Sequence, residues 1–319
     1  NMADIANTLK SGDNGFFLIF TQVLLIAGFG LKAAMIPFHA WLPDAHSSAP
    51  SPISAMLSGV LIKAVGIYAI LRLFFNMFEI SYEISMVITV IGTLSMVVGV
   101  FLAIGQWDLK RLLAYHSISQ MGYVIIGVGM GMLLLAEGGD KSIASLAIAG
   151  GLFHLVNHAV FKGLLFLNSG AIEYVTGTRN LKMMGGLFKS LPVTSTTALG
   201  ASLSISGIPP FNGFFSKLII IVAAIQGEFY LLAVLAIVVS IVTLASFMKF
   251  QRYAFFNKSK FTRKIQEVPF PMRFSMIVLV VLCVGLSLLI FPGIREVVLT
   301  PAVDVLMETT NYSSAIIGM

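Results

Sequence analysis

Charged residues are scarce in this sequence: 11% of its 319 residues are Asp, Glu, Lys or Arg, whereas 57% are hydrophobic. About a quarter of the residues of a soluble domain are charged, so this composition excludes a soluble domain, and its apolar content excludes a disordered chain. Cysteine is almost absent, because Cys283 is the only one. A lone cysteine excludes a disulfide within the chain and a cysteine-based metal site. The composition therefore predicts a polytopic membrane protein.

Acidic residues are fewer than basic ones, which gives a net charge of +6. A basic excess can indicate a nucleic-acid partner, but here the basic residues cluster in loops beside hydrophobic segments, where they determine membrane orientation. We therefore expect no nucleic-acid partner. The sequence also lacks a nucleotide-binding loop and a nucleophile beside a base, and its carboxylates lie mostly in loops. We predict no catalytic site, cofactor or metal in this chain.

Long hydrophobic runs are what the sequence does contain. Runs long enough to cross about 30 Å of hydrocarbon lie near residues 16–38, 53–75, 84–106, 112–135, 143–169, 193–225, 228–251 and 273–292. The predicted fold class is all-α, a polytopic membrane helix bundle of about eight spans. Residues 1–15 form a polar N-terminal segment and residues 16–293 the bundle. Residues 294–319 are too polar to span and are expected to lie along the membrane surface.

Two of these spans contain proline breaks. The first ends on MIPFHAWLPDAH, and the sixth has SGIPPFNG in its middle. Pro37, Pro209 and Pro210 have no amide hydrogen for the carbonyls of Ala33, Ile205 and Ser206. Such backbone is tolerated in a membrane only where it is buried in protein or lines water. The pattern favours the discontinuous helices of a transporter ion site, and a kink that serves packing alone is the alternative.

The loops differ in charge between the two sides of the predicted bundle. An even number of spans places both termini on one side. The other side then holds the basic residues Lys110, Arg111, Arg179, Lys182, Lys189, Arg252, Lys258, Lys260, Arg263 and Lys264. By the positive-inside rule this group is cytoplasmic. We expect a multi-pass protein of the cytoplasmic membrane with both termini outside.

Ionisable side chains occur within the apolar segments. His154, His158 and Lys162 follow each other at four-residue intervals, which places them on one face of a helix with about 40° of drift per step. Four more lie in other spans, namely Lys32, Lys63, His116 and Lys217. A charged lysine at the bilayer centre costs roughly 3 kcal/mol, so repeated occurrences indicate a function.

Proton relay is the chemistry that these seven residues favour. Desolvated lysines can lose and regain a proton, histidine titrates near neutral pH, and water can bridge such groups. We expect Lys162 to bridge toward His158 on one side and Lys217 on the other. The alternatives are lysines that reach the interface or pair within the bundle, and a structural histidine at position 116. Zinc binding by His154 and His158 is disfavoured, because Lys162 would repel the cation and that face has no carboxylate.

Four motifs carry a resemblance to a known family. LKAAMIPFHAWLPDAHSSAPSPISAMLSGVLIKAVGIY, DLKRLLAYHSISQMGY, HLVNHAVFKGLLFLNSG with TGTRNLKMMGGL, and SISGIPPFNGFFSK closely resemble the antiporter-like proton-translocating subunits. These subunits are shared by respiratory complex I, membrane-bound hydrogenases and multisubunit cation/proton antiporters. The motifs lie in the family's order, and the chain resembles the second part of the family's fourteen helices, from about the seventh.

The resemblance implies roles for individual residues. Lys32 corresponds to the family's seventh-helix lysine, Lys63 to the eighth-helix lysine, His158 and Lys162 to the eleventh-helix pair, and Lys217 to the twelfth-helix lysine or glutamate. The fifth-helix glutamate that pairs with the seventh-helix lysine has no counterpart in this sequence. The resemblance therefore implies that another chain, or a preceding part of this one, supplies the first six helices and that glutamate.

The resemblance also implies partners and leaves assemblies open. The first interpretation is a proton-translocating subunit of a redox-driven complex of the complex I or membrane-bound hydrogenase type. Whether it also exchanges sodium is left open. Other membrane subunits and cytoplasmic redox subunits with iron–sulfur clusters would be its partners. NHAVFKGLLFLNSGAIEYVTGTRNLKMMGGL and VPFPMR resemble the hydrogenase type more than complex I. The alternatives are a cation/proton antiporter without a redox partner and a non-conducting assembly scaffold.

Overall fold

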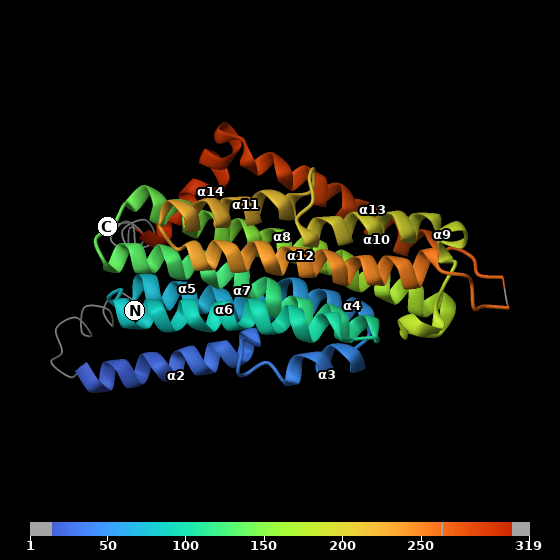
Figure 1. Ribbon diagram of the computed structural model, residues 1–319, viewed down its shortest axis with the longest axis horizontal. Coiled ribbons are helices and arrows are strands. Elements are labelled where there is room, and N and C mark those ends of the chain that lie inside the picture. Colours follow the sequence, from blue (N-terminus) through green and yellow to red (C-terminus); the bar gives the residue numbers. More distant parts are fainter. Residues whose placement is uncertain (1–14, 263, 308–319) are drawn as a thin grey trace.

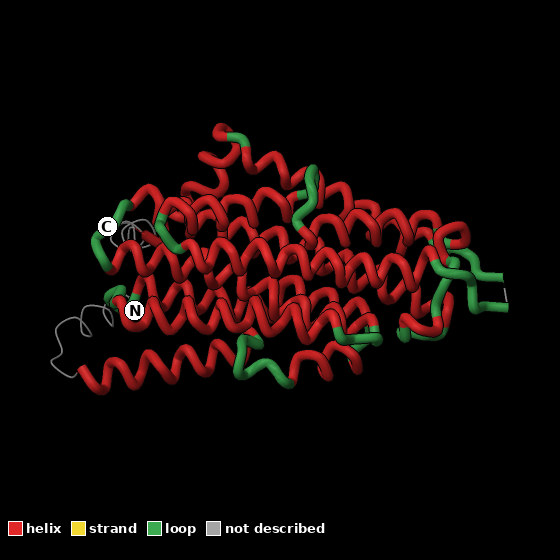
Figure 2. Tube along the Cα trace, in the orientation of Figure 1, coloured by secondary structure: helices red, strands yellow, loops and turns green. Residues whose placement is uncertain are grey.

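The computed structural model describes residues 15–262 and 264–307, which are almost entirely helical (Figures 1 and 2). The α-helices are α2 (Gly15–Ala33), α3 (Trp41–Ser48), α4 (Ser51–Met56), α5 (Ile62–Asn76), α6 (Tyr82–Ile104), α7 (Leu109–Ala136), α8 (Lys141–Thr176), α9 (Leu187–Ser190), α10 (Pro192–Ser206), α11 (Asn212–Gln226), α12 (Tyr230–Gln251), α13 (Phe270–Gly285) and α14 (Pro292–Met307). Two π-helical turns, η1 (Leu57–Leu61) and η3 (Arg252–Phe256), and two 3₁₀ turns, η2 (Leu181–Met183) and η4 (Leu286–Ile290), join them. No strand occurs in the described ranges, so the predicted all-α class is confirmed.

The predicted spans are present. Seven segments of the described chain are long and apolar enough to cross a membrane: α2, α4 to α5, α6, α7, α8, α12 with η3, and α13 with η4. The remaining predicted span is the pair α10 and α11, two short helices that follow one another along the bundle (Figure 1). The prediction of about eight spans, with two of them broken, is confirmed. The chain is a multi-pass membrane protein.

Two predicted span boundaries are wrong. The first helix ends at Ala33 rather than near residue 38, because Ala34 adopts a φ of 56° and the chain turns before α3. The helix α8 continues to Thr176 rather than ending near residue 169, and Gly177 ends it with a φ of 74°. A left-handed glycine is a common end to a helix, whereas polar residues alone do not stop one.

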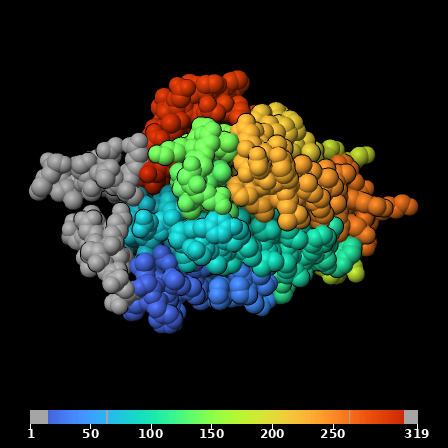
Figure 3. Space-filling model, turned by 60° about the vertical axis from the view of Figure 1, so that its left-hand side comes forward, coloured from blue at the N-terminus to red at the C-terminus, as the bar shows by residue number. Residues whose placement is uncertain are grey.

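The proposed segment boundaries at the two ends of the chain remain predictions. Residues 1–14 and 308–319 lie outside the described residues, so most of the predicted polar segment 1–15 is not described. The described part of the predicted surface segment 294–319 belongs to α14, which contacts α5 and α8. Figure 3 shows this red segment on the opposite side of the molecule from the blue α2.

The helix α7 forms the centre of the bundle. It contacts α3, α6, α8, α11 and α12, and almost every residue from Leu109 to Leu133 is buried. Small residues allow this packing: a Cβ atom at Gly122 would overlap the backbone of α6 at Gly92 and Met96. Close helix contacts of this kind replace the hydrophobic driving force that is missing in lipid. Polar side chains on α7 therefore face other helices and not lipid.

Both predicted breaks lie about midway along the bundle (Figure 1). Between α2 and α3, the Ile36 amide donates a hydrogen bond to Ser95 Oγ of α6 at 3.0 Å. Between α10 and α11, Gly207 adopts a φ of 77°, and Ser287 Oγ of η4 donates to the Pro210 carbonyl at 2.7 Å. Side chains of neighbouring helices thus bind the backbone that the breaks expose, which is how such backbone is tolerated inside a membrane protein.

Ion pairs fasten one end of the bundle, where α3, α7 and α8 meet. The pairs are Arg111 with Asp44 at 2.6 Å, Lys110 with Glu173 at 3.2 Å, and Arg179 with Asp108 at 3.3 Å. Asp108 also caps α7 by accepting a hydrogen bond from the Arg111 amide at 3.0 Å. Asp44 and Asp108 of two sequence motifs, together with Glu173, therefore serve as structural partners of basic residues at this end.

Candidate functional site

Lys217 lies on α11, two turns after the break. It is almost fully buried, and its Nζ donates to the Ile205 carbonyl at 2.8 Å and to Ser240 Oγ of α12 at 3.1 Å. Its ammonium also lies 4.6 Å from the centre of the Tyr123 ring on α7. Among the described residues, no carboxylate forms an ion pair with it. The partners of Lys217 in these contacts are therefore neutral groups.

Lys162 lies on α8 and points into the bundle. It is fully buried, and its Nζ donates to the Leu113 carbonyl of α7 at 2.6 Å. The same carbonyl accepts a hydrogen bond from Ser117 Oγ at 3.2 Å, and Ser117 Oγ lies 2.8 Å from Ser58 Oγ in the π-helical turn η1. A line of hydrogen bonds thus connects Lys162 through α7 to the second span.

The other two members of the predicted ladder are also fully buried, so all three share the face of α8 that is turned into the bundle. His154 Nδ1 lies 2.9 Å from Ser216 Oγ of α11, and its Nε2 lies 3.2 Å from Gln120 Oε1 of α7. The His158 ring meets the Phe161 ring edge-on, with 5.5 Å between the ring centres. The ladder therefore lies among α7, α8 and α11.

His116 lies inside the bundle on α7. It is fully buried, and its Nε2 lies 2.8 Å from Ser246 Oγ of α12. It also lies within electrostatic reach of three lysines: Lys162, Lys217 and Lys249. The structure thus brings His116, Lys162 and Lys217 together from three different helices.

Two predicted relay residues are not brought into this group by the described contacts. Lys32 is exposed in the last turn of α2, at the edge of the bundle. Lys63 belongs to α5, in the first turn after η1, but its side chain lies outside the part of the structure that is described. Their roles in a relay stay predictions.

Several polar residues of the site were not predicted from the sequence. Asn212 begins α11 and exchanges hydrogen bonds with Asn157 of α8: Asn212 Nδ2 donates to Asn157 Oδ1 at 2.9 Å, and Asn157 Nδ2 donates to the Asn212 carbonyl at 3.0 Å. Ser204 Oγ of α10 donates to Asn212 Oδ1 at 2.6 Å. These contacts hold the two halves of the broken helix against α8. The signal was present, because Asn157 lies within the ladder segment and Asn212 follows the prolines.

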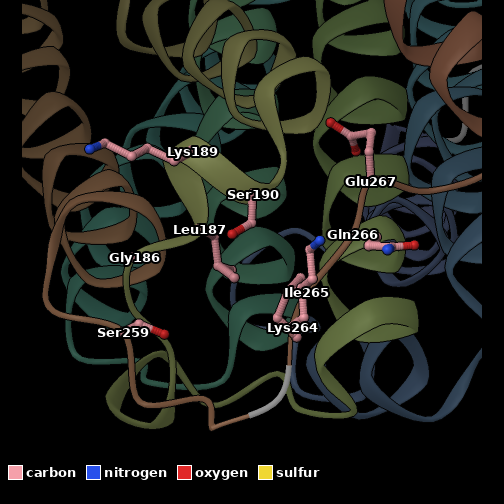
Figure 4. Close-up of a pocket in the computed structure, with 9 residues that line it drawn as sticks. All are labelled: Gly186, Leu187, Lys189, Ser190, Ser259, Lys264, Ile265, Gln266 and Glu267. Carbon is pink, nitrogen blue, oxygen red and sulfur yellow. The ribbon is translucent and has the colours of Figure 1, made fainter.

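Among the cavities of the described chain, one lies away from the lysine and histidine cluster and another reaches Lys217. One of about 450 Å³ lies between the segments 186–190 and 259–267 at the loop end (Figure 4). Its Glu267 accepts hydrogen bonds from the Val193 amide at 2.8 Å and Thr194 Oγ at 2.6 Å, so this carboxylate caps α10. Figure 4 shows the Lys189 side chain turned away from Glu267. The other, of about 220 Å³, lies between α11 and α12 beside Lys217 and is lined mainly by aliphatic side chains.

Comparisons with curated proteins find relatives among cation/proton antiporter subunits. The chain is 37% identical over 265 residues to a Na(+)/H(+) antiporter subunit of Alkalihalophilus pseudofirmus, and the match covers 83% of this chain and 51% of that protein. It is 36% identical over 325 residues to a Na(+)/H(+) antiporter subunit of Staphylococcus haemolyticus, and this match covers 97% of this chain and 40% of that protein. The chain thus spans about half or less of the length of these relatives.

Solved structures show the same fold, and a family model matches most of the chain. A chain of the Mrp complex from Dietzia superposes with a TM-score of 0.86 at 26% identity, over 98% of this chain and 64% of that one. A chain of the archaeal membrane-bound sulfane sulfur reductase gives 0.80 at 31% identity, over 92% and 48%. A chain of respiratory complex I from Thermus thermophilus gives 0.66 at 26% identity, over 88% and 58%. Residues 1–243 match the family model described as NADH:quinone oxidoreductase/Mrp antiporter, TM, and the chain belongs to this family.

Proposed function

We propose that this chain moves protons across a membrane as one subunit of a larger membrane complex. The observation that carries the proposal is the burial of Lys162 and Lys217 on two different helices, both in contact with the helix α7 that carries the buried His116. Each buried lysine costs roughly 3 kcal/mol of insertion free energy. A role in proton exchange near neutral pH would explain why the chain keeps buried lysines despite this cost.

The contacts of the two lysines suit proton exchange. A carboxylate partner would hold the proton on an ammonium group, whereas the carbonyl, hydroxyl and aromatic partners of Lys217 leave it able to give the proton up. Lys162 binds a carbonyl of the helix that carries His116. A proton that leaves Lys162 would reach Lys217 by way of the His116 imidazole, with water molecules across the remaining gaps. His154, bound to Ser216 and Gln120, lies beside this route.

The exposed Lys32 indicates a missing neighbour. The helix α2 carries large exposed apolar residues, among them Phe16, Phe20 and Leu24, and the chain spans about half of its relatives' length. We propose that another chain, or another part of the same protein, covers α2 and places an acidic residue beside Lys32. This arrangement would connect Lys32 and Lys63 to the buried cluster and to His158.

Two assemblies fit this role. In the first, the chain belongs to a redox-driven complex whose partner subunits hold iron–sulfur clusters on the cytoplasmic side, as the likeness to the sulfane sulfur reductase chain supports. In the second, it belongs to a sodium/proton antiporter, as the names of its curated relatives support. Purification of the complex under mild conditions distinguishes them. Iron–sulfur subunits in the purified complex support the first, and sodium-dependent proton movement without such subunits supports the second.

The function itself is tested in membrane vesicles of cells that express the chain with the rest of its complex. A Lys162→Met, Lys217→Met form keeps the volume of both side chains but has no proton to exchange. We expect normal assembly and loss of proton movement. A complex that still moves protons at the normal rate would favour the scaffold alternative.

A further inference from the structure

Lys249 is a half-buried lysine to which the proposed relay assigns no part. It lies in the last turn of α12, at the loop end of the bundle, and its Nζ donates to the Ile104 carbonyl and, at 2.7 Å, to the Gln106 carbonyl. Its ammonium also lies 4.8 Å from the centre of the Trp107 ring. It therefore binds the turn between α6 and α7, where the helix α7 begins.

The same face of α12 leads from Lys249 to the buried histidine. Ser246 precedes Lys249 by three residues, a spacing that brings two side chains together on a helix. Ser246 Oγ lies 2.8 Å from His116 Nε2, and Lys249 lies within electrostatic reach of the same imidazole. Lys249 is thus the outermost of a series of groups that continues inward through Ser246 and His116.

His116 has the capacity for a second partner. Its Nδ1 is buried and forms no hydrogen bond with the described residues. Buried ring nitrogens are nearly always hydrogen-bonded, by protein or by water. One ring nitrogen is hydrogen-bonded to Ser246, and the other can bind a second partner. Such an imidazole can accept a proton at one nitrogen and release a proton from the other.

We propose that Lys249 is the residue through which protons pass between the water at the α6–α7 turn and His116. This inference rests on the proposed function. A proton leaves Lys249 Nζ for a bridging water, Ser246 Oγ accepts a proton from that water and passes its own hydroxyl proton to His116 Nε2, and bulk water then restores the proton on Lys249. One proton is thereby moved from water to the imidazole, and no other bond changes.

A purely structural role for Lys249 is the competing explanation. A lysine that binds the last carbonyl of α6 and a carbonyl of the turn after it caps that helix and neutralises its negative end. Arginine would do the same, since it keeps the charge, the donors and the contact with Trp107, but it does not release a proton. The two explanations therefore differ in what Lys249→Arg does.

The experiment measures proton movement by the whole complex in membrane vesicles. We expect Lys249→Arg and Lys249→Gln to assemble and to move protons roughly tenfold more slowly, a fraction of the effect of removing a fully enclosed proton-transfer group. Lys182, whose ammonium lies 4.4 Å from the same Trp107 ring, is the matched control, and its Arg and Gln forms should keep the normal rate. A normal rate for Lys249→Arg overturns the inference.

A second variant decides the matter if Lys249→Arg fails to assemble. Ser246→Ala leaves the α6 cap in place and removes only the hydroxyl beside His116. Slower transport that Ser246→Thr restores supports the inference, and an unchanged rate contradicts it. Lys162→Met and Lys217→Met are measured in parallel. If these keep the normal rate, the proposed function itself is wrong, whereas a loss confined to them refutes only the role of Lys249.

Discussion

Lys217 Nζ donates a hydrogen bond to the carbonyl oxygen of Ile205 across the break between α10 and α11, at 2.8 Å. Pro209 has no amide hydrogen for this carbonyl, so the break creates the acceptor that holds the lysine. The proline pair and the lysine therefore act together. The prolines interrupt the helix and leave the Ile205 carbonyl without its usual amide donor, and this carbonyl is the neutral partner of the buried Lys217 ammonium.

Substitution of Lys217 tests whether its proton or only its charge is needed. We expect Lys217→Arg and Lys217→Ala to lower proton movement by about 100-fold, the lower end of the effect of removing a positioned proton-transfer group. Arginine keeps the charge but stays protonated. Transport is measured in vesicles and assembly by native gel electrophoresis. Full transport by Lys217→Arg would show that position 217 needs only a positive charge.

His116→Phe tests the central imidazole with a close control. His116 and His46 are both fully buried, and each ring lies 4.7 Å from a phenylalanine ring, Phe247 and Phe166 respectively. Phenylalanine should therefore be accommodated equally well at both positions. We expect His116→Phe to stop proton movement and His46→Phe to preserve it. Equal losses in the two variants would point to packing and not to proton transfer.

Asn212→Ala tests the clamp that holds the broken helix. The substitution removes the two hydrogen bonds of the Asn212 side chain, with Asn157 Oδ1 and with Ser204 Oγ, and keeps only the bond from Asn157 Nδ2 to the main-chain carbonyl of residue 212. Unsatisfied buried groups cost about 1 to 3 kcal/mol, so we expect a lower melting temperature of the complex and slower transport. Ser204→Ala leaves the contacts between Asn157 and Asn212 intact and should have the smaller effect. The reverse order would show that Ser204, rather than the asparagine pair, holds the break.

Gly122→Ala tests the close packing of α7 on α6. The added methyl group would overlap the α6 backbone at Gly92 and Met96, and overpacking costs about 1 to 3 kcal/mol. Gly163 on α8 is the control, because a Cβ atom there would meet only Leu279 Cδ1, at 3.8 Å. Alanine at Gly163 should be neutral or stabilising, since it is the better helix former. Thermal unfolding of the purified complex measures both, and equal melting temperatures would contradict the close packing.

Much of the fold was predictable, because each span and each proline break leaves its signal in one continuous segment. The ladder on α8 was predictable for the same reason, since helical spacing defines one face. Contacts between helices leave no such signal. Nothing in the sequence distinguishes Ser240 and Ser246 from other residues of an apolar helix. Their contacts with Lys217 and His116 arise only because α12 packs beside α11 and α7. Lys249 carries no signal of its own in the sequence, and its place near His116 depends on how α6, α7 and α12 pack. Lys32 shows the opposite case, in which a residue marked by the sequence lies outside the cluster formed by the described residues.

Cysteine labelling tests the predicted orientation. Cys283, the only cysteine of the chain, is buried, so a cysteine introduced at an exposed loop residue provides a specific target. Lys258 lies in the loop before α13, and Lys141 begins α8 at the opposite end of the bundle (Figure 1). The positive-inside rule places Lys258 in the cytoplasm. A membrane-impermeant maleimide added to intact cells should therefore label Lys141→Cys and spare Lys258→Cys, and inside-out vesicles should give the opposite result. Labelling of Lys258→Cys in intact cells would reverse the orientation, and with it the side of the membrane on which Lys249 exchanges protons with water.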